Sequence, residues 1–61
     1  QIAEVYMRGN QVFQDSEAFQ AWMEASNKAF AHKKPKMLLS SRYGVQIVLD
    51  ELGRIEHGVF S

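Results

Sequence analysis

The chain has 61 residues, of which 46% are hydrophobic, and its seven basic and seven acidic side chains give no formal net charge. A chain of this length forms one domain at most, and it buries only about 60% of the surface that its unfolded form exposes. The absence of cysteine excludes disulfides and thiolate metal sites as added stabilisation, and the balanced charge gives no net field to attract nucleic acid or anionic membranes.

Apolar residues recur three or four positions apart from Ile2 to Phe13, which is the spacing of one face of an α-helix. We predict a helix at the start of the chain that ends near Gln14. Gly9 lies inside it, where glycine costs up to about 1 kcal/mol relative to alanine. A bend or a close contact at Gly9 would account for this residue.

Asp15 marks the start of a second helix, because a carboxylate there can accept hydrogen bonds from the unpaired amides of the first turn. This helix is predicted to run to about Ser26 and to place Trp22 in the core, since a tryptophan side chain is a large source of buried area. Residues 27–34 break the helical period and are predicted to form a loop, with Phe30 turned into the core.

Pro35 suits the first position of a helix, where its missing amide hydrogen removes no hydrogen bond. We therefore predict a short helix whose apolar side is formed by Met37, Leu38 and Leu39. A basic cluster surrounds this segment. A solvated loop is the simpler interpretation of the cluster, and phosphate binding is the alternative. The cluster consists of His32, Lys33, Lys34, Lys36 and Arg42.

The last third of the chain is predicted to form one long helix from about Tyr43 to His57, which the rest of the chain covers. The serines before it are predicted caps, and Gly58 is predicted to close it in the left-handed conformation. Its apolar stripe consists of Val45, Val48, Leu49, Leu52 and Ile55. The fold class is therefore all-α, a small bundle of about four helices with a long C-terminal helix, in one domain over residues 1–61.

Asp50 and Arg54, in the same helix, have the acid-before-base order, four positions apart, that favours a surface ion pair. Gly53 lies opposite part of the apolar stripe, and we predict a close contact with another helix at this glycine.

No arrangement of residues predicts catalysis or a cofactor. His32 and His57 lie far apart in the sequence, and neither has the spacing of a metal-ligand pair. The four glycines are scattered, so no glycine-rich phosphate loop is present. We expect a protein that is not an enzyme, has no cofactor or metal, and acts through an interaction.

No apolar run reaches the roughly 20 residues that a membrane span needs, and no targeting segment is visible. We expect a soluble cytoplasmic protein that does not bind membranes. The first residue is Gln1, and the residues after it already have helical spacing. We therefore expect a fragment of a longer chain.

A set of residues along nearly the whole chain has a distinctive order and spacing: Val12-Phe13, Asp15, Ala18, Trp22-Met23, Asn27, Phe30, Pro35, Leu38-Leu39, Gly44, Val48, Leu52, Arg54-Ile55 and Gly58-Val59. This pattern resembles the toxin-binding domain of Xre/MbcA/ParS-type antitoxins, which neutralise RES-domain toxins in bacterial toxin–antitoxin systems. The family often has two glycines where this chain has Ala31-His32, so we expect a less tightly turned loop. Family members usually also carry an N-terminal helix-turn-helix domain, which this chain lacks.

The resemblance implies a protein that binds and neutralises a RES-domain toxin. Such toxins are similar to ADP-ribosyltransferases and consume NAD or transfer from it, and the family implies that the C-terminal part of the antitoxin blocks the NAD pocket. Arg54 is expected either to bind a carboxylate of the partner or to interact with the end of its own helix. The toxin-binding residues implied here are Arg54, Ile55, Gly58 and Val59, extended by the adjoining His57, Phe60 and Ser61.

Two alternatives stay open. A helical nucleic-acid-binding module is suggested by Pro35, the basic cluster and Gly44 near a helix start. A homodimerisation module would use the face of Tyr43 and Ile47. Antitoxins of this type are commonly dimeric, so a homodimer is compatible with toxin binding. In an antitoxin, DNA binding is expected only through the missing N-terminal domain.

Overall fold

The computed structural model describes residues 2–58, and its helices confirm the predicted all-α class. Three α-helices are present, α1 (Ile2–Phe13), α2 (Ser16–Glu24) and α3 (Arg42–Gly58), with the short 3-10 helices η1 (Lys28–Phe30) and η2 (Pro35–Ser40) between α2 and α3. The strand-like pairing within residues 2–58 is limited to an isolated antiparallel bridge between Asn27 and Lys33. α2 ends at Glu24, slightly before the predicted Ser26.

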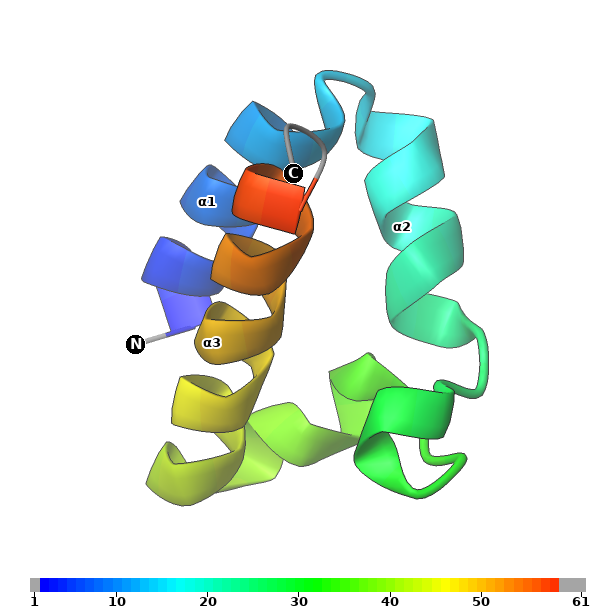
Figure 1. The fold of residues 1–61 in the computed structure, drawn as a ribbon. Coiled ribbons are helices and arrows are strands. Elements are labelled where there is room, and N and C mark those ends of the chain that lie inside the picture. Colours follow the sequence, from blue (N-terminus) through cyan, green and yellow to red (C-terminus); the bar gives the residue numbers. More distant parts are fainter. Residues whose placement is uncertain (1, 59–61) are drawn as a thin grey trace.

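α1 and α2 run in opposite directions, η1 and η2 cross one end of the molecule, and α3 then returns alongside α1 in the same direction (Figure 1). α3 packs against both α1 and η2, as expected for the helix that the rest of the chain covers. The C-terminal end of α3 therefore lies where α1 passes into α2, at the opposite end of the molecule from η1 and η2 (Figure 1).

The core is built around Phe19, which is 1% exposed. The Phe19 ring meets Tyr6 edge-on and stacks on Trp22, with centroid separations of 5.7 and 6.2 Å. Trp22 packs against the core as predicted, but it is only partly buried, so Phe19 and not Trp22 is the enclosed aromatic residue. The buried cluster consists of Val5, Phe19, Met23, Phe30, Val45, Val48 and Leu52.

Two glycines allow close contacts between segments. A Cβ atom at Gly9 would overlap the ring of Phe19, and one at Gly44 would overlap the backbone carbonyl of Leu38. The close contact predicted at Gly9 is thus confirmed. The contact predicted at Gly53 is wrong, because a Cβ atom there would meet nothing within 4 Å.

Side-chain caps begin α2 and α3 as predicted. Asp15 Oδ1 accepts hydrogen bonds from the amides of Glu17 and Ala18 at 3.0 and 3.5 Å. Ser41 Oγ accepts one from the amide of Gly44 at 3.0 Å, so of the two serines Ser41 is the cap. These bonds satisfy amides that the first turn of a helix leaves unpaired.

The predicted closure of α3 at Gly58 is wrong. α3 includes Gly58, and no glycine among residues 2–58 has a positive φ angle. Glycine adopts helical and left-handed conformations about equally readily, so its identity alone does not decide between them.

The loop over residues 27–34 is more ordered than predicted. It contains η1, and Asn27 Oδ1 caps this turn by accepting a hydrogen bond from the amide of Ala29 at 2.9 Å. Ala31 and His32 both have left-handed backbones, with φ angles of 57° and 66°. The expectation of a less tightly turned loop is therefore wrong, because these residues adopt the conformation that suits glycine. Phe30 is in the core as predicted, 8% exposed.

Candidate functional site

The described part of the predicted binding site lies at the end of α3. Arg54, Ile55, His57 and Gly58 all belong to this helix. The other predicted residues, Val59–Ser61, lie outside the described residues.

One side of α3 lies between the core and solvent. Ile47, Glu51 and Ile55 follow one another four positions apart along it, and each is partly buried. Arg54 continues this side toward the C-terminal end. His57 is exposed and lies two positions after Ile55, about 200° around the helix. Arg54 lies one position before Ile55, about 100° around the helix, and three positions before His57, about 60° around it. The structure therefore places His57 beside Arg54 on the exposed side and separates it from Ile55.

Glu51 holds the side chain of Arg54. Arg54 Nε donates a hydrogen bond to Glu51 Oε1 at 3.0 Å, and Arg54 Nη2 donates a second one to Oε2. The Glu51 side chain is 12% exposed, whereas that of Arg54 is 69% exposed. These hydrogen bonds and the negative charge of Glu51 raise the pKa of Arg54 above its ordinary value. Arg54 is thus an oriented cation that remains open to solvent.

The ion pair predicted between Asp50 and Arg54 is wrong. Asp50 Oδ1 instead accepts a hydrogen bond from Gln46 Nε2 at 3.0 Å. The longer Glu51 side chain places both of its oxygens on the guanidinium, the bidentate geometry that gives the stronger pair. The spacing of Glu51 and Arg54 was visible in the sequence, but the partial burial of Glu51 was not.

A groove of about 400 Å³ lies at the opposite end of the same side of α3. Tyr43 stands at this groove with 78% of its surface exposed. Sequence reasoning placed Tyr43 and Ile47 on one face but missed the groove, because its other walls come from η1, the following turn and η2. The lining residues are Ala29, Phe30, Ala31, Lys33, Leu38, Ser41, Tyr43, Gly44 and Ile47.

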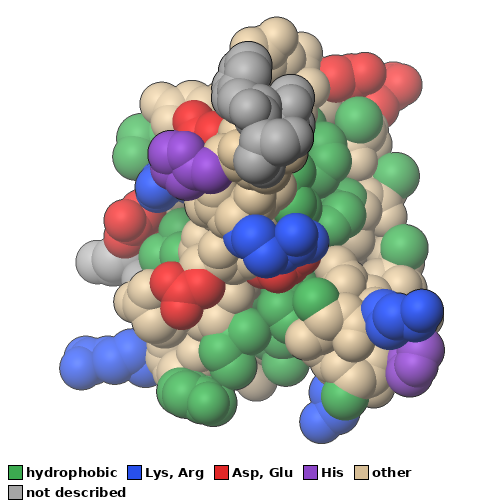
Figure 2. Space-filling view, in the orientation of Figure 1, with side chains coloured by type: hydrophobic (Ala, Val, Ile, Leu, Met, Phe, Trp, Pro, Cys, Tyr) green, Lys and Arg blue, Asp and Glu red, His purple; other side chains and the backbone are tan. Residues whose placement is uncertain are grey.

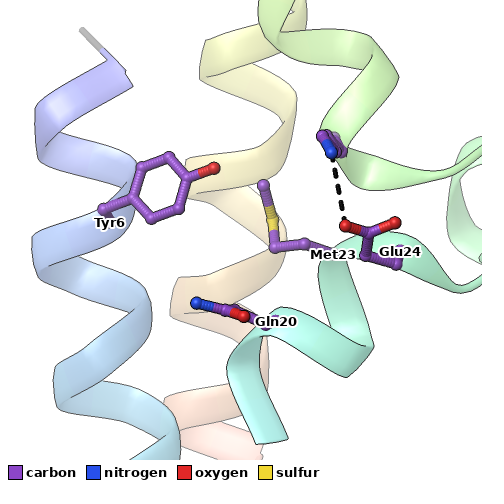
Figure 3. Close-up of a pocket in the computed structure, with 5 residues that line it drawn as sticks. Tyr6, Gln20, Met23 and Glu24 are labelled. Carbon is purple, nitrogen blue, oxygen red and sulfur yellow. Dashed lines mark hydrogen bonds and ion pairs between the residues drawn. The ribbon is translucent and has the colours of Figure 1, made fainter. Parts of the chain in front are cut away.

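A second pocket, of about 220 Å³, is lined by residues of α1, α2 and η2. Tyr6 from α1 and Met23 from α2 point toward each other in it (Figure 3). Its two charged groups pair, since Lys36 Nζ lies 3.2 Å from Glu24 Oε2 (dashed line in Figure 3). This pairing leaves the pocket without a separate charge with which to hold a ligand.

Neither a metal centre nor a membrane span is found in the described part of the chain. Residues 2–58 contain no group of three or more His, Cys, Asp or Glu side chains that could hold a metal ion. No helix within the same range has the length and apolar character needed to cross a membrane.

Comparison with known proteins gives one family. Residues 8–58 match the family described as the antitoxin Xre/MbcA/ParS C-terminal toxin-binding domain. The chain belongs to this family. The match confirms the resemblance seen in the sequence. The range of this Xre/MbcA/ParS domain that matches the family contains the Glu51–Arg54 pair and every residue of the groove. It also contains the predicted toxin-binding residues as far as Gly58.

A curated relative is named Antitoxin Xre and comes from Yersinia enterocolitica serotype O:8 / biotype 1B, strain NCTC 13174 / 8081. It is 45% identical to this Xre/MbcA/ParS domain over 40 residues, which are 66% of the chain and 27% of the relative. The chain therefore spans about a quarter of the length of the curated relative that it matches. No solved structure matches the chain.

Proposed function

We propose that this chain is the toxin-binding domain of an antitoxin, and that it acts by binding a toxin protein and not by catalysis. The family match over residues 8–58 carries this proposal, because the family is described by its binding of a toxin. The relative named Antitoxin Xre supports it.

The proposed toxin is of the RES type, an NAD-consuming enzyme similar to ADP-ribosyltransferases, as the resemblance in the sequence implies. The proposed mechanism is occlusion, in which the end of α3 and Val59–Ser61 block the NAD pocket of the toxin. Val48 and Leu52 support this mechanism, because both are fully buried and fix α3 to the core. A helix held in this way loses little conformational entropy when a partner binds its end.

Arg54 is the proposed anchor of this contact. The two hydrogen bonds that Arg54 donates to Glu51 orient the guanidinium in the unbound protein, so less rotamer freedom is lost on binding. A guanidinium favours carboxylates as partners. We propose that the remaining N–H groups of Arg54 bind a carboxylate of the toxin while Ile55, partly buried beside it, contributes apolar contact area.

We also propose that the domain is one part of a longer, cytoplasmic and homodimeric antitoxin. DNA binding in such a protein is assigned to a separate N-terminal domain, which the family resemblance implies. The length of the relative beyond the matched segment supports this division.

The proposal is tested by isolating the full-length natural protein from its host through an N-terminal tag and identifying the proteins that accompany it. We expect a small NAD-consuming protein encoded beside the antitoxin gene. Arg54→Ala should lower the affinity for this protein at least tenfold, because central arginines often contribute more than about 1.4 kcal/mol to an interface.

Met7→Ala is the control for Arg54→Ala. Met7 lies on α1 and is 59% exposed, so its truncation should leave the partner bound. Isolation of DNA alone, or of the antitoxin alone, would contradict the proposed function.

A further inference from the structure

The charges of this neutral chain are separated along the molecule. The sequence from Ala25 to Leu49 has no Asp or Glu, but it contains five of the seven Lys and Arg residues, namely Lys28, Lys33, Lys34, Lys36 and Arg42. This segment forms η1, η2 and the first turns of α3. Lys and Arg side chains gather toward that end of the molecule, whereas most Asp and Glu side chains lie farther from it (Figure 2).

Most of these cations have no internal partner. Among residues 2–58, Lys36 pairs with Glu24, whereas no ion pair forms at Lys28, Lys33, Lys34 or Arg42. All of these side chains are exposed. The molecule therefore has a basic end whose charge is not neutralised within the described residues.

The groove at this basic end has an apolar floor. Phe30 is buried, Leu38 and Ile47 are partly buried, and Lys33 is the charged residue of the lining. Gly44 lets η2 pass directly against α3, and Leu38 of η2 and Ile47 of α3 both line the groove. Hydrophobic side chains are visible between the basic ones on this face (Figure 2). The groove thus combines a recess for an apolar side chain with a positive rim.

We propose that this groove binds an acidic segment of the toxin that carries a large apolar side chain. The inference rests on the proposed function, and it adds a second contact on the same partner. The apolar side chain packs between Phe30 and Ile47 beneath the exposed ring of Tyr43, and a neighbouring carboxylate faces Lys33. Desolvated aromatic contacts of this kind often dominate binding, and the charges accelerate association.

One partner can reach both contacts. Ile47 at the groove and Gly58 at the end of α3 are 11 positions apart, which is about 16 Å along a helix. An interface of standard size, with about 800 Å² buried on each side, extends over such a distance.

The same observations disfavour two other occupants. In a two-fold dimer each patch faces its own copy, so a second chain would bring the unpaired cations of both copies together. Duplex DNA would complement the cations, but its bases are stacked inside the helix, and its phosphates and sugars offer no large apolar group to fill the recess.

The test introduces a carboxylate into the groove with Ala29→Glu. Ala29 lines the groove and is exposed, so the larger side chain can be accommodated without a change in the core. Ala21→Glu is the matched control, because Ala21 is exposed on α2 and does not line the groove. Tyr43→Ala removes the exposed ring and provides a second variant should Ala29→Glu fail to fold.

Calorimetry measures the dissociation constant between each full-length variant and the purified toxin. Melting curves show whether each variant is folded. We expect Ala29→Glu and Tyr43→Ala to bind at least tenfold more weakly, and Ala21→Glu to bind within twofold of the wild type. Higher salt should weaken wild-type binding more than binding by Lys33→Gln.

Unchanged affinity of both groove variants, with Arg54→Ala still weakened, would overturn the groove assignment and leave the proposed function standing. Absence of toxin binding by the wild type would overturn both. If the groove variants instead lost dimer mass in sedimentation or lost DNA retention, with toxin affinity unchanged, a second copy or nucleic acid would be the occupant and the inference would fail.

Discussion

Ala31 and His32 carry side chains in a backbone conformation that favours glycine. Their positive φ angles turn the chain after Phe30, and the amide of His32 donates a hydrogen bond to the Asn27 carbonyl at 2.8 Å. The left-handed conformation costs a residue with a Cβ atom roughly 1–2 kcal/mol. Histidine is among the residues that tolerate it better than most, so the greater strain is expected at Ala31.

We predict that Ala31→Gly stabilises the protein by about 1 kcal/mol, because the relief of strain exceeds the added entropy of glycine in the unfolded chain. The free energy of unfolding from a urea titration measures this effect. The control is Ala21→Gly within α2, where the same substitution should destabilise by about 0.5–1 kcal/mol. Destabilisation by Ala31→Gly would contradict the left-handed turn.

α3 is positioned by its contact with η2, whose backbone lies directly against the helix. Gly44 lies against the Leu38 carbonyl, and Ser41 caps the helix three residues earlier. On the other side of the core, Gly9 lets α1 approach the ring of Phe19. The placement of α3 against η2, and with it the position of Arg54, therefore depends on a small residue far from the helix end.

Alanine substitutions at the glycines should have graded effects. Gly44→Ala is expected to destabilise by about 3 kcal/mol because a backbone carbonyl cannot rotate away, and Gly9→Ala by about 1–3 kcal/mol because the Phe19 ring is packed in the core. Gly53→Ala should stabilise by about 0.5–1 kcal/mol, since its Cβ atom enters open space within a helix. Urea titrations of the three variants measure the order, and a neutral Gly44→Ala would contradict the packing of η2 on α3.

Local signals in the sequence predicted the helices well. Apolar spacing and the caps Asp15 and Ser41 act within a few residues, so they can be read without the fold. The enclosure of Phe19 instead of Trp22, and the open space at Gly53, depend on distances between segments remote in sequence. The groove could not be predicted for the same reason, because three separate segments form its walls.

The predicted binding residues stay predictions, because the fold shows where they lie on α3 and not what they bind. Arg54 and His57, three positions apart, share the exposed side of α3, whereas Ile55 is partly buried. The pairing of Arg54 with Glu51 was decided by side-chain length and partial burial. Side-chain length is known from the sequence, but the partial burial of Glu51 follows from packing and not from spacing. Family membership was readable because it depends on the order of many residues, most of which serve the core or the caps.

The chain has no net charge, but the two ends of the molecule differ in their charged side chains. The end formed by η1 and η2 is basic and has an apolar groove, whereas the other presents Arg54 beside Glu51. α3 joins the two as a helix anchored in the core by Val48 and Leu52. In the proposed complex, the groove contributes affinity and the end of α3 blocks the toxin's active site.

In the proposed mechanism, the end of α3 and the residues after it occlude the NAD pocket of the toxin. The most direct measurement is the rate of NAD consumption by the purified toxin, titrated with the full-length antitoxin at several NAD concentrations. Occlusion predicts inhibition that weakens as NAD is raised. It also predicts at least a tenfold loss of inhibition when Val59–Ser61 are removed, while the truncated protein still binds the toxin through the groove. Inhibition independent of NAD, together with full neutralisation by the truncated protein, would contradict occlusion of the NAD pocket.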